Sequence, residues 1–124
     1  MPFTIRLDEA KNRMYLTLTG LMTDEETKVA ADAAIEGFKK LKPGFCVIND
    51  ISKFRPLTKE GVAHVKRAGE AAAALKMRAT VRIVGISPTA LQQFQRAAKE
   101  GAYTAYTAQS MEEAEAMLDA HKDD

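Results

Sequence analysis

The sequence has only one cysteine and no long apolar run, and each of these features excludes a class of protein. A single cysteine, Cys46, among 124 residues excludes an internal disulfide framework and a multi-cysteine metal site. No segment approaches the roughly 20 consecutive apolar residues that cross a membrane, and no secretory signal pattern opens the chain. These absences predict a soluble, cytoplasmic protein with one domain over residues 1–124.

Histidine is also scarce, which bears on catalysis. Nucleophilic catalysis needs a nucleophile, a base and an orienting group in one cleft, but the chain has only His64, inside an expected helix, and His121, near its end. Cys46 lies within an apolar strand pattern, which favours an inert core thiol. No group of histidine, cysteine and acidic residues has the spacing of metal ligands. We therefore expect no catalytic residue, no metal site, no cofactor and no enzymatic activity.

What is present is a globular composition with clear periodicity. Hydrophobic residues make up 46% of the chain and charged residues 28%, which is typical of a folded domain. Residues 3–7 and 14–18 alternate apolar and polar side chains, which predicts a β-hairpin with one buried face. The charged connector between the two strands, residues 8–13, is expected at the surface.

The rest of the chain alternates strand and helix patterns. Expected strands cover 45–48, ending at Asn49–Asp50, then 80–86 and 102–106; expected helices cover 24–41, 58–76, 88–101 and the segment from 111. Capping residues mark the helix starts, with Thr23 and Ser110 each followed three residues later by glutamate. The resulting order, ββαβαβαβα, predicts an α/β fold in which helices pack against a mixed, mostly parallel sheet.

Charge is unevenly distributed along the chain. Residues 52–99 contain ten basic and two acidic residues, a net charge of +8, whereas the remainder carries −7. This asymmetry favours a basic surface that attracts an acidic partner. The alternative is that the net charges of solvent-exposed helix faces differ by chance. No aromatic residues interleave with the basic ones, so we do not expect nucleic-acid binding.

Several stretches resemble a known family. They are residues 47–58, 78–84, 91–96 and 110–118. With the order of elements, they resemble the STAS domains, the fold of bacterial anti-sigma-factor antagonists. They are more similar to the SpoIIAA-like proteins, which share structure with CRAL-TRIO lipid-binding domains. The resemblance implies a regulatory or scaffold domain that binds a protein partner.

The chain departs from the STAS pattern at the regulatory serine. STAS antagonists carry an Asp-Ser-Ser-Gly motif at the start of the second helix, and a partner kinase phosphorylates its serine. Aligning Gly61 with the motif's glycine places Lys59 or Glu60 at the phosphoacceptor position, and neither has a hydroxyl group. Thr58 and Ser52 are the nearby hydroxyls, and whether either is phosphorylated stays open. We expect an antagonist-like domain without the phosphoserine switch.

The expected partner-binding surface is the loop 51–57 with the start of the second helix. Its anchors are Lys53, Phe54, Arg55, Thr58 and Lys59. Phe54 beside Arg55 motivates this choice, because aromatic residues and arginine are enriched at interface hot spots. The alternative is that Phe54 packs under the helix as part of the core.

Two further functions stay open. The six methionines, among them Met14, Met22 and Met77, could line an adaptable cavity for a small apolar, lipid-like ligand, or could simply fill the core. The opening hairpin could expose an edge strand, which would allow a homodimer.

Overall fold

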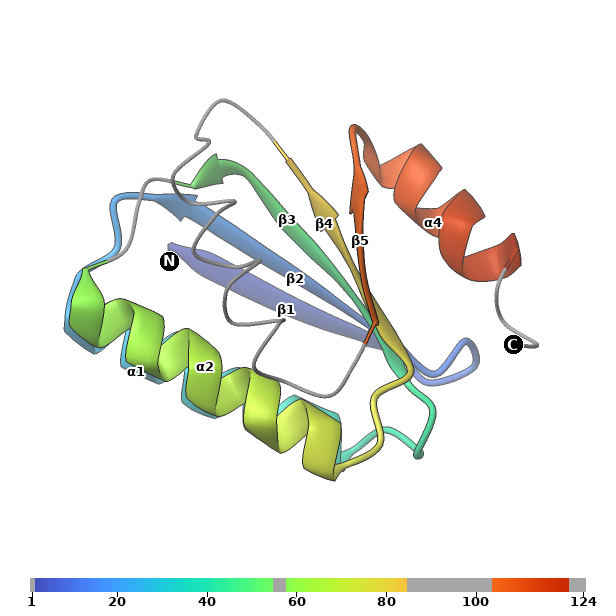
Figure 1. The fold of residues 1–124 in the computed structure, drawn as a ribbon, viewed down its shortest axis with the longest axis horizontal. Coiled ribbons are helices and arrows are strands. Elements are labelled where there is room, and N and C mark those ends of the chain that lie inside the picture. Colours follow the sequence, from blue (N-terminus) through green and yellow to red (C-terminus); the bar gives the residue numbers. More distant parts are fainter. Residues whose placement is uncertain (1, 55–57, 85–103, 121–124) are drawn as a thin grey trace.

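The computed structural model describes residues 2–54, 58–84 and 104–120 (Figure 1). The elements are β1 (Phe3–Asp8), β2 (Arg13–Gly20), α1 (Asp24–Lys39), β3 (Cys46–Phe54), α2 (Lys59–Ala74), β4 (Ala79–Ile83), β5 (Thr104–Ala108) and α4 (Met111–Ala120). The helix expected over 88–101 lies outside the described residues. The α/β class and the order of the described elements are confirmed.

The described strands form one five-stranded sheet in the order β1-β2-β3-β4-β5. The predicted hairpin is present, because β1 pairs antiparallel to β2 with Phe3 opposite Leu18 and Leu7 opposite Met14. Each later strand pairs parallel to its neighbour, and α1 and α2 provide the crossovers from β2 to β3 and from β3 to β4. The sheet is therefore mixed and mostly parallel, as predicted.

Strand β3 is longer than expected. The sequence pattern predicted that the strand would end at Asn49–Asp50 and that 51–57 would form a loop. Instead β3 continues to Phe54, because β2 extends beside it as far as Gly20, opposite Phe54. Strand β5 also differs from the prediction, since it runs from Thr104 to Ala108 rather than over 102–106.

Helices cover both faces of the sheet (Figure 1). Helices α1 and α2 lie side by side on one face, and α4 lies on the other. Beneath α1 and α2 the buried side chains include Met14, Phe38, Phe45 and Val47. Beneath α4 they include Tyr15, Cys46, Ile48, Val81 and Leu118. The apolar run at the start of β3 is therefore buried on both faces, as its composition predicted.

Strand β2 does not follow the predicted pattern of one buried face. Met14 and Leu18 point toward α1 and α2, but Tyr15 is buried beneath α4. Arg13, expected at the surface, is also buried. The pattern looked one-sided because arginine and tyrosine count as polar in a periodicity analysis, whereas both can be buried when a partner satisfies their polar ends.

The helix starts form as their capping residues predicted. The hydroxyl of Thr23 accepts a hydrogen bond from the backbone N–H of Glu26, whose carboxylate accepts one from the N–H of Thr23. Ser110 caps α4 by accepting from the N–H of Glu113, although the Glu113 carboxylate accepts from the N–H of Gln109 rather than that of Ser110. These contacts are local, which explains why sequence spacing located them.

Candidate functional site

A cavity of about 90 Å³ lies between the sheet and the layer of α1 and α2. Its sheet side includes Leu16, Leu18, Val47, Asn49, Thr80 and Arg82. Its helix side includes Thr27, Ala30, Ala31 and Ala34 of α1 and Val65, Ala68, Gly69 and Ala72 of α2. Most of these residues are apolar, which is typical of small-molecule sites.

The small size of the helix side chains explains the empty space. Where α1 and α2 face the sheet at the cavity, they present mainly alanine and one glycine, whose side chains end at Cβ or before it. The predicted inward residues Ala30, Ala34 and Ala72 are buried as expected. Side chains this short cannot fill the distance between the helices and the pleated sheet, so a cavity remains.

The sheet side of the cavity contains three buried polar residues. Asn49 lies directly opposite Arg82 on the neighbouring strand, and Thr80 lies opposite Val47 in the adjacent row. The Thr80 hydroxyl donates a hydrogen bond to the Val47 carbonyl, over 3.1 Å. Among the described residues, the side-chain oxygen of Asn49 has no hydrogen-bond partner. The cavity therefore combines apolar walls with a polar end.

Sequence reasoning missed this polar end. Arg82 was counted among the basic residues of an expected surface, and Asn49 was placed at the end of a strand. The structure corrects both assignments, because each is buried within its strand. A usable signal was present, since Thr80 and Arg82 alternate with apolar Val81 and Ile83, which places the two polar residues on one face.

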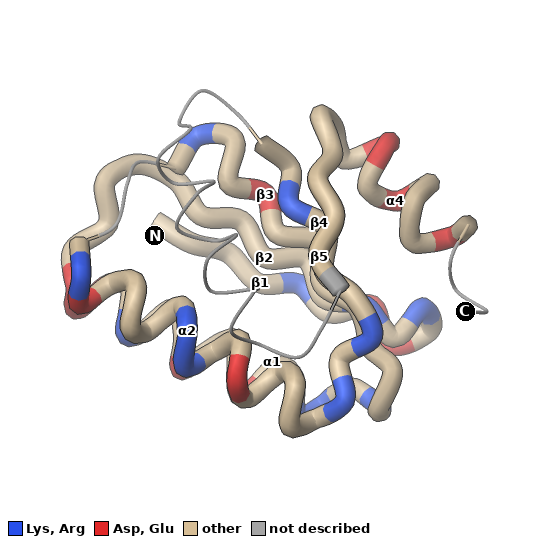
Figure 2. The backbone as a smooth tube through the Cα atoms, viewed as in Figure 1, with Lys and Arg blue, Asp and Glu red and all other residues tan. Residues whose placement is uncertain are grey.

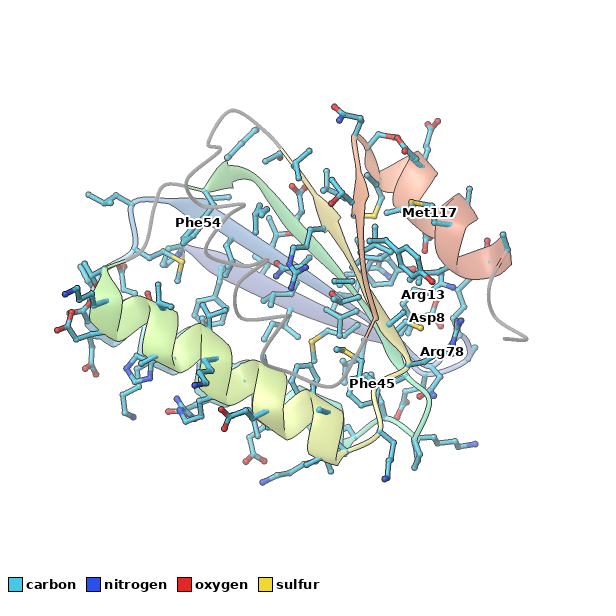
Figure 3. All side chains as sticks on the ribbon, in the orientation of Figure 1. Asp8, Arg13, Phe45, Phe54, Arg78 and Met117 are labelled. Atoms are coloured by element: carbon cyan, nitrogen blue, oxygen red, sulfur yellow. The ribbon has the colours of Figure 1, made fainter. Side chains whose placement is uncertain are left out.

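A second polar cluster lies on the opposite face, beneath α4 (Figure 3). Arg13 donates hydrogen bonds to Glu115 and, over 3.0 Å, to Asp119. The Tyr15 hydroxyl donates to the same Glu115 carboxylate over 2.8 Å, and the Arg6 guanidinium lies 3.9 Å from the centre of the Tyr15 ring. This cluster connects β1, β2 and α4.

The pKa values in this cluster reflect its ion pairs. Burial would raise the pKa of Glu115, but hydrogen bonds from Tyr15 and Arg13 and the positive charges of Arg13 and Lys11 outweigh burial and lower it. Burial and the hydrogen bond to Glu115 raise the pKa of Tyr15. At neutral pH the cluster therefore contains an ionised glutamate and a neutral tyrosine, which is a structural arrangement rather than an acid–base pair.

The predicted partner surface is only partly present. Phe54, expected as a surface anchor, is 1% exposed and packs in the core with Leu18 and Ile51, because β3 continues through it. The core alternative for Phe54 is therefore correct. Lys53 and Lys59 are exposed, and Arg55 lies outside the described residues.

The two candidate hydroxyls both have local roles. Thr58 caps α2 by accepting from the Gly61 N–H over 3.1 Å, and its hydroxyl donates to the Asp24 carboxylate at the start of α1. The Ser52 hydroxyl donates to Asp50 over 2.6 Å. Sequence reasoning missed Leu21, which is 71% exposed just beyond the end of β2.

Charge is distributed over the surface less simply than the sequence suggested (Figure 2). Helix α4 is acidic, with Glu112, Glu113, Glu115 and Asp119 and no basic residue. Helix α2 is mixed, however, and the buried Arg82 contributes nothing to a basic surface. Two of the four acidic residues of α4, Glu115 and Asp119, pair with Arg13, which offsets part of the negative charge of this helix.

The remaining candidates for chemistry are placed as expected. His64 is half-buried on α2, with its Nδ1 atom 3.4 Å from a guanidinium nitrogen of Arg67. Cys46 is buried in the core, and burial raises the pKa of its thiol.

Within residues 2–54, 58–84 and 104–120, no three histidine, cysteine or acidic side chains gather where they could hold a metal ion. No helix of the described chain has both the length and the apolar character that a membrane crossing needs.

No model of a known protein family matches the chain, and no curated protein matches it significantly. The cavity with its buried polar end is therefore the feature on which a functional assignment depends.

Proposed function

We propose that the protein is a non-enzymatic binding domain that takes up a small, largely apolar ligand in the cavity beneath α1 and α2. The observation that carries this proposal is the cavity itself, which has apolar walls from both helices and the sheet. Close-packed cores contain few voids larger than a water molecule, so a cavity of about 90 Å³ is a candidate binding site rather than ordinary packing.

The size of the cavity limits the ligand. A dry apolar cavity of about 150 Å³ binds benzene, which has six carbon atoms, so a cavity of about 90 Å³ holds about four non-hydrogen atoms. A complete lipid chain does not fit within this space. The ligand is accordingly a short molecule, which narrows the lipid-like class expected from the sequence.

Filling the cavity with a larger side chain tests this function. Ala68 lines the cavity on α2 and is half-buried, so Ala68→Leu places three additional carbon atoms at the cavity wall. Ala63 is exposed on the same helix, and Ala63→Leu is the matched control. Binding of 1-propanol, followed by chemical-shift changes of Val47 and Val65, should be lost in Ala68→Leu and kept in Ala63→Leu. If 1-propanol does not bind to the unaltered protein, the proposal is wrong.

A second function has its own support. We propose that the end of the molecule around Leu21 contacts a protein partner, consistent with a STAS-like, SpoIIAA-like regulatory domain in the cytoplasm. Leu21 is exposed and follows Gly20, the last residue of β2, which lies opposite Phe54 at the end of β3, and the Thr58–Asp24 hydrogen bond links the starts of α1 and α2. The exposed Leu21 and the exposed Lys53 and Lys59 are the candidate contact residues of this proposal.

This surface can be tested separately from the cavity. Leu21→Asp removes an exposed apolar side chain that does not line the cavity, whereas Met111→Asp changes an apolar side chain on α4 that is 38% exposed. A protein purified with the chain from its own cells should be lost with Leu21→Asp and retained with Met111→Asp. Among the described strands β1 pairs only with β2, so sedimentation over a concentration series should accompany this test and would reveal a homodimer.

A further inference from the structure

Strand β1 forms one edge of the described sheet (Figure 1). It pairs with β2, and within residues 2–54, 58–84 and 104–120 no other segment forms backbone hydrogen bonds with it. The side of β1 that faces away from β2 therefore has backbone N–H and C=O groups without a partner in the described chain. Such an edge can be extended by another strand.

The hydrogen-bond pattern shows which groups face away from β2. In an antiparallel pair, residue pairs that exchange hydrogen bonds alternate with pairs that do not. The Pro2 carbonyl accepts from the N–H of Thr19, opposite it, over 2.8 Å, so the bonded pairs continue at Thr4 and Arg6. The residues whose backbone groups point away from β2 are Phe3, Ile5 and Leu7. The edge thus offers three donors and three acceptors.

This edge lacks the features that usually prevent pairing with another chain. Proteins protect their edge strands with prolines, lysines and β-bulges. Strand β1 contains no proline or lysine, and its register with β2 is regular along its whole length. Its one basic side chain, Arg6, lies over the Tyr15 ring, so the guanidinium covers a face of the sheet and not the edge.

Helix α1 has an exposed apolar side chain on the side that lies above β1. A Cβ atom at Gly37 would be 3.6 Å from the Leu7 side chain, which places this part of α1 over β1. Ala33 and Val29 precede Gly37 by four and eight residues, so they continue the same side of the helix. Val29 is nevertheless 43% exposed. A strand added beside β1, with a helix above it, would give Val29 an apolar contact.

We propose that β1 pairs antiparallel with β1 of a second copy of the chain, about a two-fold axis at Ile5. Ile5 then lies opposite its own copy, and Phe3 lies opposite Leu7, so the outward donors and acceptors of both strands form six hydrogen bonds. These three side chains share the face covered by α1, so apolar side chains meet apolar ones. On the other face, Thr4 lies opposite Arg6.

Other positions of the axis give a poorer match, which is why a second copy in this register is the occupant that the edge fits. With the axis at Arg6, the two arginines lie directly opposite each other, and like charges in such pairs are destabilising. With the axis at Thr4, Leu7 lies opposite residue 1, which precedes the strand, and its hydrogen bonds are lost. The register at Ile5 uses every outward group of β1.

Charge substitutions at Thr4 test this register by sedimentation equilibrium of the full chain. Thr4 is exposed, and in the dimer it lies opposite Arg6 of the other copy at two symmetric places. Thr4→Lys should weaken dimerisation about fivefold, whereas Thr4→Glu should strengthen it about fivefold. Thr107→Lys and Thr107→Glu are the matched controls, because Thr107 is an exposed threonine on β5, and both should leave dimerisation unchanged.

Amide hydrogen exchange identifies the strand that pairs. The N–H groups of Thr4 and Arg6 bond to β2, so they should be protected at every protein concentration. The N–H groups of Phe3, Ile5 and Leu7 should exchange rapidly in the monomer and become protected as the dimer forms. Protection that alternates along β1 in this way is not expected from an interface on another surface.

Three results would overturn the proposal. They are a chain that stays monomeric throughout the concentration series, a dimer that responds equally to lysine and glutamate at residue 4, and a dimer in which the Ile5 amide exchanges as fast as in the monomer. None of them bears on the ligand-binding function, because no residue of β1 lines the cavity.

Discussion

The guanidinium of Arg13, at the first residue of β2, is held by the carboxylates of Glu115 and Asp119, which follow it by 102 and 106 residues. The side chain of Arg13 is only 4% exposed, so these carboxylates provide much of the compensation for its buried charge. Tyr15, two residues along the same strand, donates to Glu115 as well. The packing of α4 on the sheet therefore depends on charge in addition to the apolar contacts of Ala114 and Leu118.

Removing the Glu115 carboxylate should destabilise the protein. Glu115→Ala leaves both Arg13 and Tyr15 without their shared acceptor, so we expect the free energy of unfolding in urea to fall by about 2 kcal/mol. Glu112→Ala removes an exposed glutamate from the same helix and should cost no more than about 0.5 kcal/mol. Similar losses for the two variants would show that the Arg13 cluster does not contribute to stability.

The same carboxylate predicts how stability depends on pH. The pKa of Glu115 is lower in the folded protein than in the unfolded chain, because the bonds from Tyr15 and Arg13 outweigh burial. Its contribution is therefore complete above the unfolded pKa of about 4.3 and is lost as the pH falls through the lower, folded pKa. The difference in unfolding free energy between the unaltered protein and Glu115→Gln should be constant from about pH 7 to 5 and shrink below about pH 4. A difference that grows on acidification would contradict this assignment.

Gly37 allows a close approach between α1 and the sheet. A Cβ atom at this position would collide with the terminal methyl group of Met14, which is completely buried. Replacing glycine by alanine normally stabilises a helix by about 1 kcal/mol, but here the end of the flexible, buried Met14 side chain has to shift, so we expect Gly37→Ala to lose this gain and to cost no more than about 1 kcal/mol. In a Met14→Leu background, which lacks that methyl group, Gly37→Ala should be neutral or stabilising. Equal effects in both backgrounds would rule out the contact as the cause.

Cys46 should be chemically inert in the folded protein. Burial raises the pKa of its thiol despite the positive charges of Arg78 and Arg13, so both the thiolate fraction and the access of reagents are low. Alkylation should be slow in buffer and should accelerate with urea in parallel with unfolding. Ala63→Cys adds an exposed thiol on α2 and provides the internal control for a freely reactive group. Rapid alkylation of Cys46 in buffer would show that its strand is accessible.

Local features were predictable from sequence, and contacts between distant segments were not. The Thr23 cap and the hairpin depend on residues that are close in sequence, so spacing alone located them. Phe54 was ambiguous because its burial depends on how far β2 extends beside β3. Arg13 was misplaced because its partners lie in α4, and no local pattern indicates a partner more than a hundred residues away.

The candidate site illustrates the same limit. Ala30, Ala34, Ala68 and Ala72 were correctly assigned to the inner face, whereas the buried Ala31 was missed. The sequence does not show whether a small side chain brings a helix closer to the sheet or leaves space. Whether space remains depends on the distance between each helix and the sheet. Larger residues at the cavity, such as Phe38 and Met77, set this distance. Arg82 was assigned to the surface because arginine is usually exposed, although its alternation with apolar Val81 and Ile83 was a local sign that it lies within a strand.

The long sequence separation within the Arg13 cluster affects how the protein folds during synthesis. The ribosome completes β1, β2, β3 and β4 before α4 emerges, so the face of the sheet that carries Arg13 and Tyr15 has no cover from α4 until then. An unpaired arginine on that face keeps the growing chain hydrated and opposes premature burial against other apolar surfaces. Translation of α4 then neutralises the charge of Arg13 and covers this face of the sheet in one step. A nascent chain stalled before residue 111 should therefore be far more sensitive to protease than one from which α4 has emerged.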